Sequence, residues 1–594
     1  MCGIFGINKK ETQLFINKVI NENNHRGPDE NNYFQNDILT LIHNRLSILD
    51  IEHGSQPMYF EDLVIIYNGE IFNSTFLRKK LEKKGYFFST KNSDTEVILK
   101  LYHFKGKDML LDLNGMFSFV IFDKKKNTLF GAVDRFSIKP LYYTNKKDLF
   151  SFSSEIKPLL NLKEINKTLS KKSIYNYFQL QYVPFEETIY EEIKKLKNSS
   201  FFIYDLKKKL LKIEEYKKED KKYFFKDYNE VVEFGKNSLF NSVKNWSQSD
   251  VSISCSLSGG LDSSLISSIF AKNSIDKIKT VTVGFDGDDK KYDERYFASK
   301  MSDYIGSDHH EVIIDPNKIL HDLDRIFENL SEPYGGSLAS WYVYSNLGSD
   351  KVIFTGTGAD EIFGNYGKWK CYTLSDFFIR NFYNNFARQK ISNLKYFYGY
   401  LYQKIFYEKD LRKLFIDYKS DNNLIYNIHS LVLSKKFEPK KNIQEIDFNM
   451  QLPWEFLYIT DRLSMINSVE TRTPFLDDEM MSFISSVPNN LMGKLTNSKK
   501  LLKDISKGLI PDEIINRKKK GFVLPKENWL KNDLKNKLNY YSSKEFINNQ
   551  NIFSENELKY LIENFYKYKN NNFLVEKIWT FFIFQFWYEK TFLR

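Results

Sequence analysis

The strongest constraint on the fold is a short Gly-rich segment between two apolar stretches near the middle of the chain. The segment is Ser258-Gly259-Gly260-Leu261-Asp262-Ser263-Ser264, with residues 251–257 before it and residues 265–271 after it. The pattern predicts a strand, a tight turn and a helix, which is the start of an α/β unit. The two glycines permit close backbone approach, and the hydroxyl and amide groups suit an anion such as pyrophosphate. A plain strand-Gly-Gly-helix turn is the alternative. Because a terminal GK[ST] is missing, a kinase or an ordinary NTPase is disfavoured.

The length of 594 residues predicts at least two domains, because a single hydrophobic core stops growing well before that size. A hydrophobic content of 42% with 27% charged residues is typical of a soluble protein with sizeable cores. The net charge of +11 comes from scattered lysines that form no long basic block, so a nucleic-acid partner is not expected.

The first third of the chain is predicted to be strand-rich, with short β-branched and aromatic runs such as 63–67 and 117–122 between Asn, Asp and Gly residues. A Lys/Glu-rich stretch at 206–222 is interpreted as the boundary region, although an ordinary charged hairpin explains it equally well. We therefore expect one domain over 1–205 and a second over 206–594. From about Leu374 the pattern is mostly helical.

Three cysteines, Cys2, Cys255 and Cys371, offer neither a disulfide framework nor a CxxC metal site, which fits a reducing compartment. The eight histidines include no HExxH zinc pattern. The N-terminus has no basic leader followed by a long apolar stretch, so a cytoplasmic protein is expected. The apolar segment 578–588 is short and ends in charged residues, which favours a core helix over a membrane span.

A second group of candidate catalytic residues begins with Cys2, directly after Met1. Removal of the methionine would give one residue both a thiol and a free amine, and the amine can then act as general base for the thiol. An incidental buried cysteine is the alternative. In Tyr67-Asn68-Gly69-Glu70, the Asn amide and the Gly backbone N–H could hold an oxyanion. Arg45 and Asp94 supply the opposite charges that an amino-acid substrate requires.

The N-terminal part resembles the class II glutamine amidotransferases. The resemblance is carried by Met1-Cys2-Gly3-Ile4-Phe5-Gly6, His25-Arg26-Gly27-Pro28-Asp29, His43-Asn44-Arg45-Leu46-Ser47-Ile48 and Asn68-Gly69-Glu70. It implies an α+β Ntn-hydrolase sandwich with helix, sheet, sheet and helix layers, in which Cys2 is the nucleophile and Asn68 and Gly69 form the oxyanion hole. The residues implied to bind glutamine are Arg45, Leu46, Ser47, Ile48, Leu49, Asn68, Gly69, Glu70 and Asp94. One departure is Ser137, where the family usually has Gly, so we expect the loop conformation there to differ.

The heptapeptide resembles the PP-loop of ATP pyrophosphatases, and three further segments extend the resemblance to asparagine synthetases. They are Val281-Thr282-Val283-Gly284-Phe285, Gly358-Ala359-Asp360-Glu361-Ile362-Phe363-Gly364 and the run from Ser468 to Asp477. The resemblance implies an α/β synthetase domain with helical additions, a tract at 368–451 being interpreted as a helical insertion. The residues implied to bind ATP are Ser256, Leu257, Ser258, Gly259, Gly260, Asp262, Ser263, Ser264, Val283, Thr355 and Gly356. Asp262 and Asp360 would hold Mg²⁺, which needs few protein carboxylates. Lys499 aligns with the lysine that neutralises charge on the adenylate.

The resemblance predicts that glutamine and ATP are substrates and that aspartate is amidated to asparagine, with AMP and pyrophosphate released. It also implies an internal passage for ammonia and leaves a homodimer open; no membrane partner is expected.

Two departures affect the acceptor: Thr357 stands where the family has an acidic residue, and the segment 332–337 lacks a further acid. An amidotransferase of the same architecture acting on another carboxylate, such as a sugar acid, is the main alternative. Phosphosugar and phosphoribosyl amidotransferases share only the first domain and do not need the PP-loop. A catalytically silent paralogue that serves as a binding protein is the remaining alternative.

Overall fold

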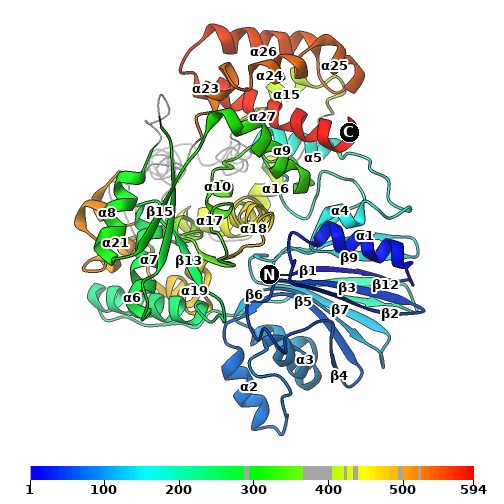
Figure 1. The fold of residues 1–594 in the computed structure, drawn as a ribbon, viewed down its shortest axis with the longest axis vertical. Helices are drawn as coiled ribbons and strands as arrows, with labels where there is room; N and C mark the ends of the chain where they lie inside the picture. The colour runs from blue at the N-terminus through cyan, green and yellow to red at the C-terminus, as the bar shows by residue number, and fades with distance from the viewer. Residues whose placement is uncertain are drawn as a thin grey trace, which may run out of the picture.

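A computed structural model describes residues 2–286, 293–364, 405–419, 424–431, 439–492, 499–518 and 524–593. The chain forms an N-terminal sandwich of two β-sheets, an α/β part built on a third sheet, and a group of C-terminal helices (Figure 1). The N-terminus lies at the junction between the sandwich and the α/β part. The tract predicted as a helical insertion, 368–451, lies largely outside the described residues.

The sandwich consists of two six-stranded sheets. One sheet has the order β10-β8-β9-β1-β3-β2 and comprises β1 (Gly3–Ile7), β2 (Glu30–Asn36), β3 (Leu39–Arg45), β8 (Tyr142–Lys146), β9 (Leu149–Ser153) and β10 (Lys194–Lys195). The other has the order β12-β11-β7-β6-β5-β4 and comprises β4 (Met58–Phe60), β5 (Leu63–Ile71), β6 (Gly115–Asp123), β7 (Thr128–Val133), β11 (Ser200–Asp205) and β12 (Leu210–Glu215). Strands such as β5 and β6 are apolar on both faces because each sheet is covered on both sides.

Helices cover the outer face of each sheet. The helices on the first sheet are α1 (Gln13–Asn23) and α4 (Ile156–Leu159), whereas α5 (Lys171–Leu180) packs against α27 (Asn572–Tyr588). The second sheet is covered by α3 (Asp94–Lys105), with α2 (Ser74–Glu82) packed against α3 and a 3₁₀ turn following at Gly106–Leu111. The predicted helix-sheet-sheet-helix sandwich is therefore confirmed, as are the strands predicted at 63–67 and 117–122.

The charged stretch after residue 205 begins as a hairpin. Strand β12 pairs antiparallel with β11 and belongs to the sandwich, which agrees with the hairpin explanation for the first part of the stretch. The domain boundary at 205 stays a prediction.

The third sheet is parallel and has the order β15-β14-β13-β16-β17. Its strands are β13 (Ile253–Ser256), β14 (Lys279–Gly284), β15 (Asp308–Ile313), β16 (Val352–Phe354) and β17 (Glu470–Arg472). The helices around it are α6 (Tyr228–Trp246), α7 (Leu261–Asn273), α8 (Arg295–Ile305), α9 (Ile319–Asn329), α10 (Ser340–Tyr344), α11 (Ala359–Phe363), α18 (Tyr458–Met465) and α19 (Asp478–Ser486). Helices α7 and α8 pack on one face, whereas α10 and α18 pack on the face turned toward the sandwich (Figure 1). The predicted α/β unit is confirmed.

The remaining elements are helical. They are α15 (Glu408–Leu414), α16 (Leu424–Ser430), α17 (Pro439–Ile446), the π-helical stretch η4 (Asp447–Leu457), the 3₁₀ turn at Pro474–Leu476, α20 (Asn489–Met492), α21 (Lys500–Ser506), α22 (Asp512–Asn516), α23 (Lys526–Lys531), α24 (Lys535–Tyr541), α25 (Lys544–Gln550), α26 (Glu555–Lys567) and α27 (Asn572–Tyr588), with shorter turns at Pro316–Lys318 and Glu589–Leu593. Helix α27 is buried along most of its length, so the core helix predicted at 578–588 is confirmed. Among the described helices, none combines the length and the apolar character needed to cross a bilayer.

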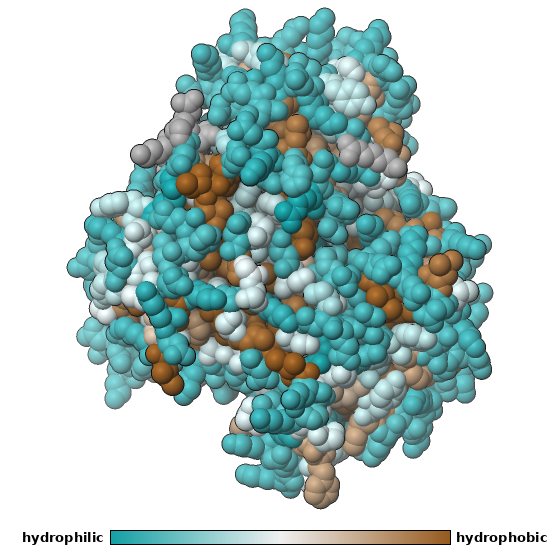
Figure 2. Space-filling model, in the orientation of Figure 1, coloured by the Kyte–Doolittle hydropathy of each residue, from teal (hydrophilic) through white to brown (hydrophobic). Residues whose placement is uncertain are grey.

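Apolar packing joins the sandwich to the α/β part. One core cluster combines Phe72, Met116 and Phe136 of the sandwich with Trp246 and Phe475 of the α/β part. On the face shown in Figure 2, hydrophilic residues cover most of the surface and hydrophobic residues show only in small separate groups. The large apolar side chains therefore serve mainly the shared interior.

Candidate active sites

The first site is centred on Cys2, a buried residue immediately before β1. The backbone N of Cys2 donates to Asn68 Oδ1 over 2.9 Å, so the β5 amide lies beside the atom that becomes an amine if Met1 is removed. Burial raises the pKa of the Cys2 thiol, while the nearby terminal amine and the Leu46 backbone N–H counteract the shift. A thiol with a raised pKa stays protonated near neutral pH, and its attack on an amide therefore needs a base.

The Asn68-Gly69 pair lies toward the end of β5, where this strand pairs with β6. Gly69 has φ of +152°, and a Cβ built on it would lie 2.1 Å from the Met116 carbonyl oxygen. Any larger residue would push the two strands apart. The strand pairing thus requires glycine directly after Asn68, which accepts from Cys2 N, and a backbone N–H at this position could bind a developing oxyanion.

Arg45 holds the loop that follows β3. Its guanidinium donates to the Asp50 carbonyl over 2.7 Å and to the Ile51 carbonyl over 3.0 Å, and it pairs with Glu30. The side chains of Leu46 and Ile48 pack into an apolar cluster with Val352 and Met465 of the α/β part. Arg45 therefore fixes the conformation of this loop, and Leu46 and Ile48 attach the loop to the α/β part.

Two buried carboxylates lie on the other side of Asn68. Asp94 Oδ2 accepts from the Tyr67 hydroxyl over 2.8 Å and from Ile71 N over 2.9 Å. Burial raises the pKa of Asp94 to about 6, although these hydrogen bonds oppose the shift. Burial also raises the pKa of Glu70. The negative charges of Asp94 and Glu470 raise this pKa further, and the positive charge of Arg472 opposes the shift. Such an acidic pocket suits the ammonium group of an amino acid.

Ser137 keeps the conformation that favours glycine. Its φ is +52°, in the left-handed region. The buried carboxylate of Asp134 fixes this loop by accepting from the backbone N–H groups of Phe136, Ile138, Lys139 and Phe117. These four hydrogen bonds hold the loop backbone in one conformation. Ser137 therefore keeps its positive φ although this conformation strains a residue that has a side chain.

The second site forms at the carboxyl ends of β13, β14 and β16. Gly259 has φ of +64°, and a Cβ on it would lie 2.5 Å from the backbone of Phe297, so the turn needs glycine. The hydroxyls of Ser258 and Ser263 lie 3.0 Å apart, and Ser263 also accepts from Ser258 N. The loop precedes α7, whose N-terminal N–H groups favour an anion. The predicted Gly-rich turn at the start of a helix is confirmed.

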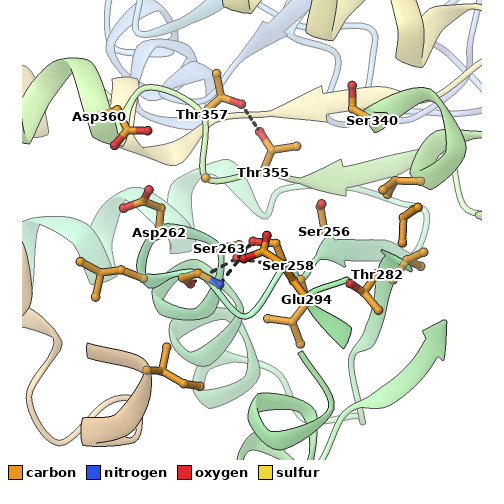
Figure 3. Close-up of a pocket in the computed structure, with 18 of the residues that line it drawn as sticks. Ser256, Ser258, Asp262, Ser263, Thr282, Glu294, Ser340, Thr355, Thr357 and Asp360 are labelled. Atoms are coloured by element: carbon orange, nitrogen blue, oxygen red, sulfur yellow. Dashed lines mark hydrogen bonds between the residues drawn. The ribbon is translucent and has the colours of Figure 1, made fainter. Parts of the chain in front are cut away.

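A cavity of about 480 Å³ opens above this loop. The strands β14 and β16 lie on opposite sides of β13, so the strand order of the sheet reverses at β13. The cavity lies at this point, which is the usual position of a ligand in parallel sheets. Figure 3 shows Asp262, Asp360 and Thr357 toward one end of the cavity and Ser256, Thr282 and Ser340 toward the other. Nine of the eleven residues predicted to bind ATP line it: Ser256, Leu257, Ser258, Gly260, Asp262, Ser263, Val283, Thr355 and Gly356.

Lys499 joins the two acidic residues that were expected to hold a metal. Its Nζ lies 2.6 Å from Asp262 Oδ1 and 2.7 Å from Asp360 Oδ1. Burial lowers the pKa of Lys499, but the two carboxylates outweigh this and raise it above its ordinary value. The two carboxylates therefore converge on one positive charge. Two oxygen donors beside a phosphate-binding loop also fit Mg²⁺, which completes its shell with water and phosphate oxygens.

The structure adds residues to which the sequence assigned no role. In the cavity, Glu294 pairs with Arg517, whose Nη1 donates to the Gly259 carbonyl over 2.7 Å. Arg517 therefore braces the PP-loop from a distant helix. No motif pointed to this pair, because its members are far apart in sequence. Thr357 lines the cavity and accepts from the Thr355 hydroxyl over 3.1 Å.

Comparison with known families fits this geometry. A glutamine amidotransferase domain model matches residues 1–217, and the asparagine synthase model matches residues 236–589. The chain belongs to the asparagine synthase family. It is 29% identical to asparagine synthetase [glutamine-hydrolyzing] 1 of Bacillus subtilis over 99% of this chain and 96% of that protein. It is 36% identical to the putative asparagine synthetase [glutamine-hydrolyzing] 2 of Methanocaldococcus jannaschii over 62% of this chain and 76% of that protein.

A more distant relative has a different name. The amidase chyE of Penicillium rubens is 26% identical over 91% of this chain and 89% of that protein. The protein described in this structure is, as a member of the asparagine synthase family, an ATP-dependent carbon–nitrogen ligase with glutamine as amido donor. Family membership leaves the acceptor carboxylate to be inferred from the site.

Proposed function

We propose that the protein is a glutamine-dependent asparagine synthetase, which converts ATP, aspartate and glutamine into asparagine, glutamate, AMP and pyrophosphate. The observation that supports this most is the combination, in one chain, of a buried N-terminal cysteine beside Asn68 and Gly69 with a PP-loop cavity containing Asp262, Asp360 and Lys499. Each half alone serves many reactions, but together they release ammonia and activate a carboxylate.

In the first site, the Cys2 thiol would attack the amide carbon of glutamine. The Cys2 amine, free once Met1 is removed, would take the thiol proton. Asn68 and Gly69 would stabilise the oxyanion, and collapse of the intermediate would break the C–N bond and release ammonia. Water then hydrolyses the thioester to glutamate. Glu70 and Asp94 would bind the substrate ammonium and Arg45 the substrate carboxylate.

In the second site, a carboxylate oxygen of the acceptor would attack the α-phosphorus of ATP and displace pyrophosphate. The N–H groups at the start of α7 and the hydroxyls of Ser258 and Ser263 would hold the phosphates. A bound Mg²⁺, held by Asp262 and Asp360, would neutralise phosphate charge. Ammonia then attacks the acyl carbon and AMP leaves. Lys499 would balance charge on the acyl phosphate.

The cavity also supports a second candidate, an acceptor that carries no ammonium group. The described acidic side chains that line the cavity are Asp262, Asp360 and Glu294, and each lies beside Lys499 or Arg517. Thr357 contributes a hydroxyl, which cannot act as a base near neutral pH. These features favour a hydroxylated carboxylate, such as a sugar acid. The cytoplasmic location, the ammonia passage and a homodimer stay predictions.

An acceptor panel tests both candidates. The purified enzyme is supplied with ATP, Mg²⁺ and ammonium chloride together with aspartate or one of several sugar acids, and pyrophosphate and amide products are measured. Asparagine formed only with aspartate supports the first candidate. Pyrophosphate and amide formed only with a sugar acid would replace aspartate but keep the ligase, whereas no acceptor-dependent pyrophosphate release would refute the synthetase function.

A further inference from the structure

The carbonyl oxygen of the nucleophilic residue is held by an arginine that the second domain also contacts. Arg26, just after α1, is completely buried, and its Nε donates to the Cys2 carbonyl over 3.1 Å. After removal of Met1, Cys2 would be tethered by a peptide bond on one side only. Its position would then depend on two contacts, from Asn68 to its nitrogen and from Arg26 to its carbonyl oxygen.

The orientation of Arg26 is fixed in turn by a carboxylate of the other domain. Asp461 on α18 accepts from Arg26 Nη1 over 3.0 Å and from Nη2 over 3.2 Å, while Glu155 accepts from Nη1 over 2.7 Å. Asp461 is 1% exposed. A carboxylate that accepts from both terminal nitrogens fixes the guanidinium plane, and with it the direction of the Nε–H bond.

The next residue on α18 holds the same region from a second direction. Arg462 pairs with Glu155 and donates to the Ser154 carbonyl over 2.8 Å. Ser154 Oγ accepts from Ile4 N over 3.1 Å, at the start of β1. Helix α18 therefore supports both Arg26 and the strand that follows Cys2.

Neighbouring residues of this helical segment line the ATP cavity. Thr460 on α18 and Phe456 just before it line the cavity. The chain continues from α18 into β17, where the Arg472 carbonyl accepts from Thr355 N over 3.0 Å. Asp461 thus lies on an element that lines one site and supports the nucleophile of the other.

We infer that Asp461 is a positioning residue for the glutaminase reaction: from the synthetase domain, it orients Arg26 so that Arg26 holds the Cys2 carbonyl and keeps the thiol in place. The inference rests on the proposed role of Cys2 as nucleophile. It means that the glutaminase site is completed only when α18 is docked. A small displacement of a nucleophile can reduce a rate by about two orders of magnitude.

The test uses full-length Asp461→Asn, which keeps the side-chain shape but removes its charge. We expect kcat for glutamate release from glutamine to fall about tenfold or more, with KM changed less than about twofold. Alkylation of Cys2 by 6-diazo-5-oxo-L-norleucine, followed by mass spectrometry, should slow in parallel. Ammonia-dependent pyrophosphate release should stay within about twofold of the wild type, because ATP and the acceptor do not use Arg26. Asp461→Glu, which keeps the charge, should recover part of the loss.

Asp410→Asn is the matched control. Asp410 belongs to α15, which lies among the C-terminal helices (Figure 1), and it pairs with Lys577, so its loss should leave both activities unchanged. If Asp461→Asn does not fold, Arg26→Lys tests the same link from the other side, because lysine has no Nε–H for the Cys2 carbonyl. Where both variants fold, the double variant should be no slower than the worse single one.

The inference is overturned if Asp461→Asn keeps kcat for glutamine hydrolysis within twofold, or if it loses glutamine hydrolysis and ammonia-dependent activity equally. It is also overturned if Arg26→Lys keeps full glutaminase activity. Failure of the proposed function would look different, because the wild type itself would then release no glutamate and resist alkylation at Cys2.

Discussion

At the scale of single residues, the two sites depend on different side chains, so their activities should separate. Cys2→Ala should abolish glutamine-dependent amidation and leave ammonia-dependent amidation within about twofold, because the thiol only releases nitrogen. Asp262→Asn should spare glutamine hydrolysis and remove AMP formation with either nitrogen source, since a neutral amide is a poorer ligand for Mg²⁺ and a weaker partner for Lys499. Glutamate and AMP are measured for each variant with either nitrogen source. Loss of ammonia-dependent amidation in Cys2→Ala, or loss of glutamine hydrolysis in Asp262→Asn, would contradict the division of labour.

The Asp94 carboxyl predicts how glutamine binding depends on pH. Its pKa is raised to about 6 by burial, so the carboxyl gains a proton as the pH falls through that value. A neutral carboxyl binds the glutamine ammonium less well, and KM for glutamine in glutamate release should therefore rise below about pH 6. Asp94→Asn should have a high KM that no longer varies in this range. A wild-type KM that is constant from pH 5 to 8 would exclude the assignment.

The raised pKa of Asp94 also makes the stability of the folded protein depend on pH. The folded state holds the Asp94 proton more tightly than the unfolded chain, in which the carboxyl has its ordinary pKa of 3.8. The contribution of this group to stability is therefore fully present below pH 3.8 and is lost as the pH rises through about 6. Near neutral pH the folded protein therefore lacks the stability that the protonated Asp94 carboxyl contributes at low pH. Carboxyl groups with a raised pKa are common at functional sites.

At the scale of elements, the loop after β7 carries backbone strain that a single change should relieve. Ser137 has φ of +52°, which costs a non-glycine residue about 1–2 kcal/mol, while glycine adds about 0.5–1 kcal/mol of unfolded-state entropy. Ser137→Gly should therefore stabilise the protein by roughly 0.5–1 kcal/mol in urea unfolding. Ser93→Gly is the control: Ser93 precedes α3 with φ of −60°, so glycine should destabilise there. Equal destabilisation by both variants would contradict the strain.

The elements also show what the sequence could predict. The strand-turn-helix at 251–271 and the strands β5 and β6 were predictable, because their apolar pattern and glycines are local signals. The pairing of Arg26 with Asp461 and of Glu294 with Arg517 was not, because these partners lie 435 and 223 residues apart and no local pattern specifies them. The roles of Arg45 and Glu70 in glutamine binding stay predictions, since they depend on a ligand.

At the scale of the whole molecule, the interface between sandwich and α/β part combines an apolar core with buried polar contacts. Phe72 stacks on Trp246 with ring centroids 4.2 Å apart, and Arg472 lies over the same Phe72 ring. Trp246 Nε1 donates to Asp477, which also accepts from Asn114 of the sandwich. Domains that share a buried apolar interface do not unfold independently. We therefore predict one calorimetric unfolding transition for the wild type.

Phe72→Ala should separate that transition into two. Truncation of a buried Phe costs about 3–5 kcal/mol, and here the loss falls on the contact between the domains. The control is Phe130→Ala, because Phe130 is equally buried but packs on Tyr102 and Phe201 within the sandwich. It should lower Tm and keep a single transition, since the interface stays intact. Two transitions in the wild type, or a single transition in Phe72→Ala at the Tm of Phe130→Ala, would show that the shared core does not couple the two halves. Because α18 completes the first site only when docked, glutaminase activity on heating should be lost with the first transition of Phe72→Ala.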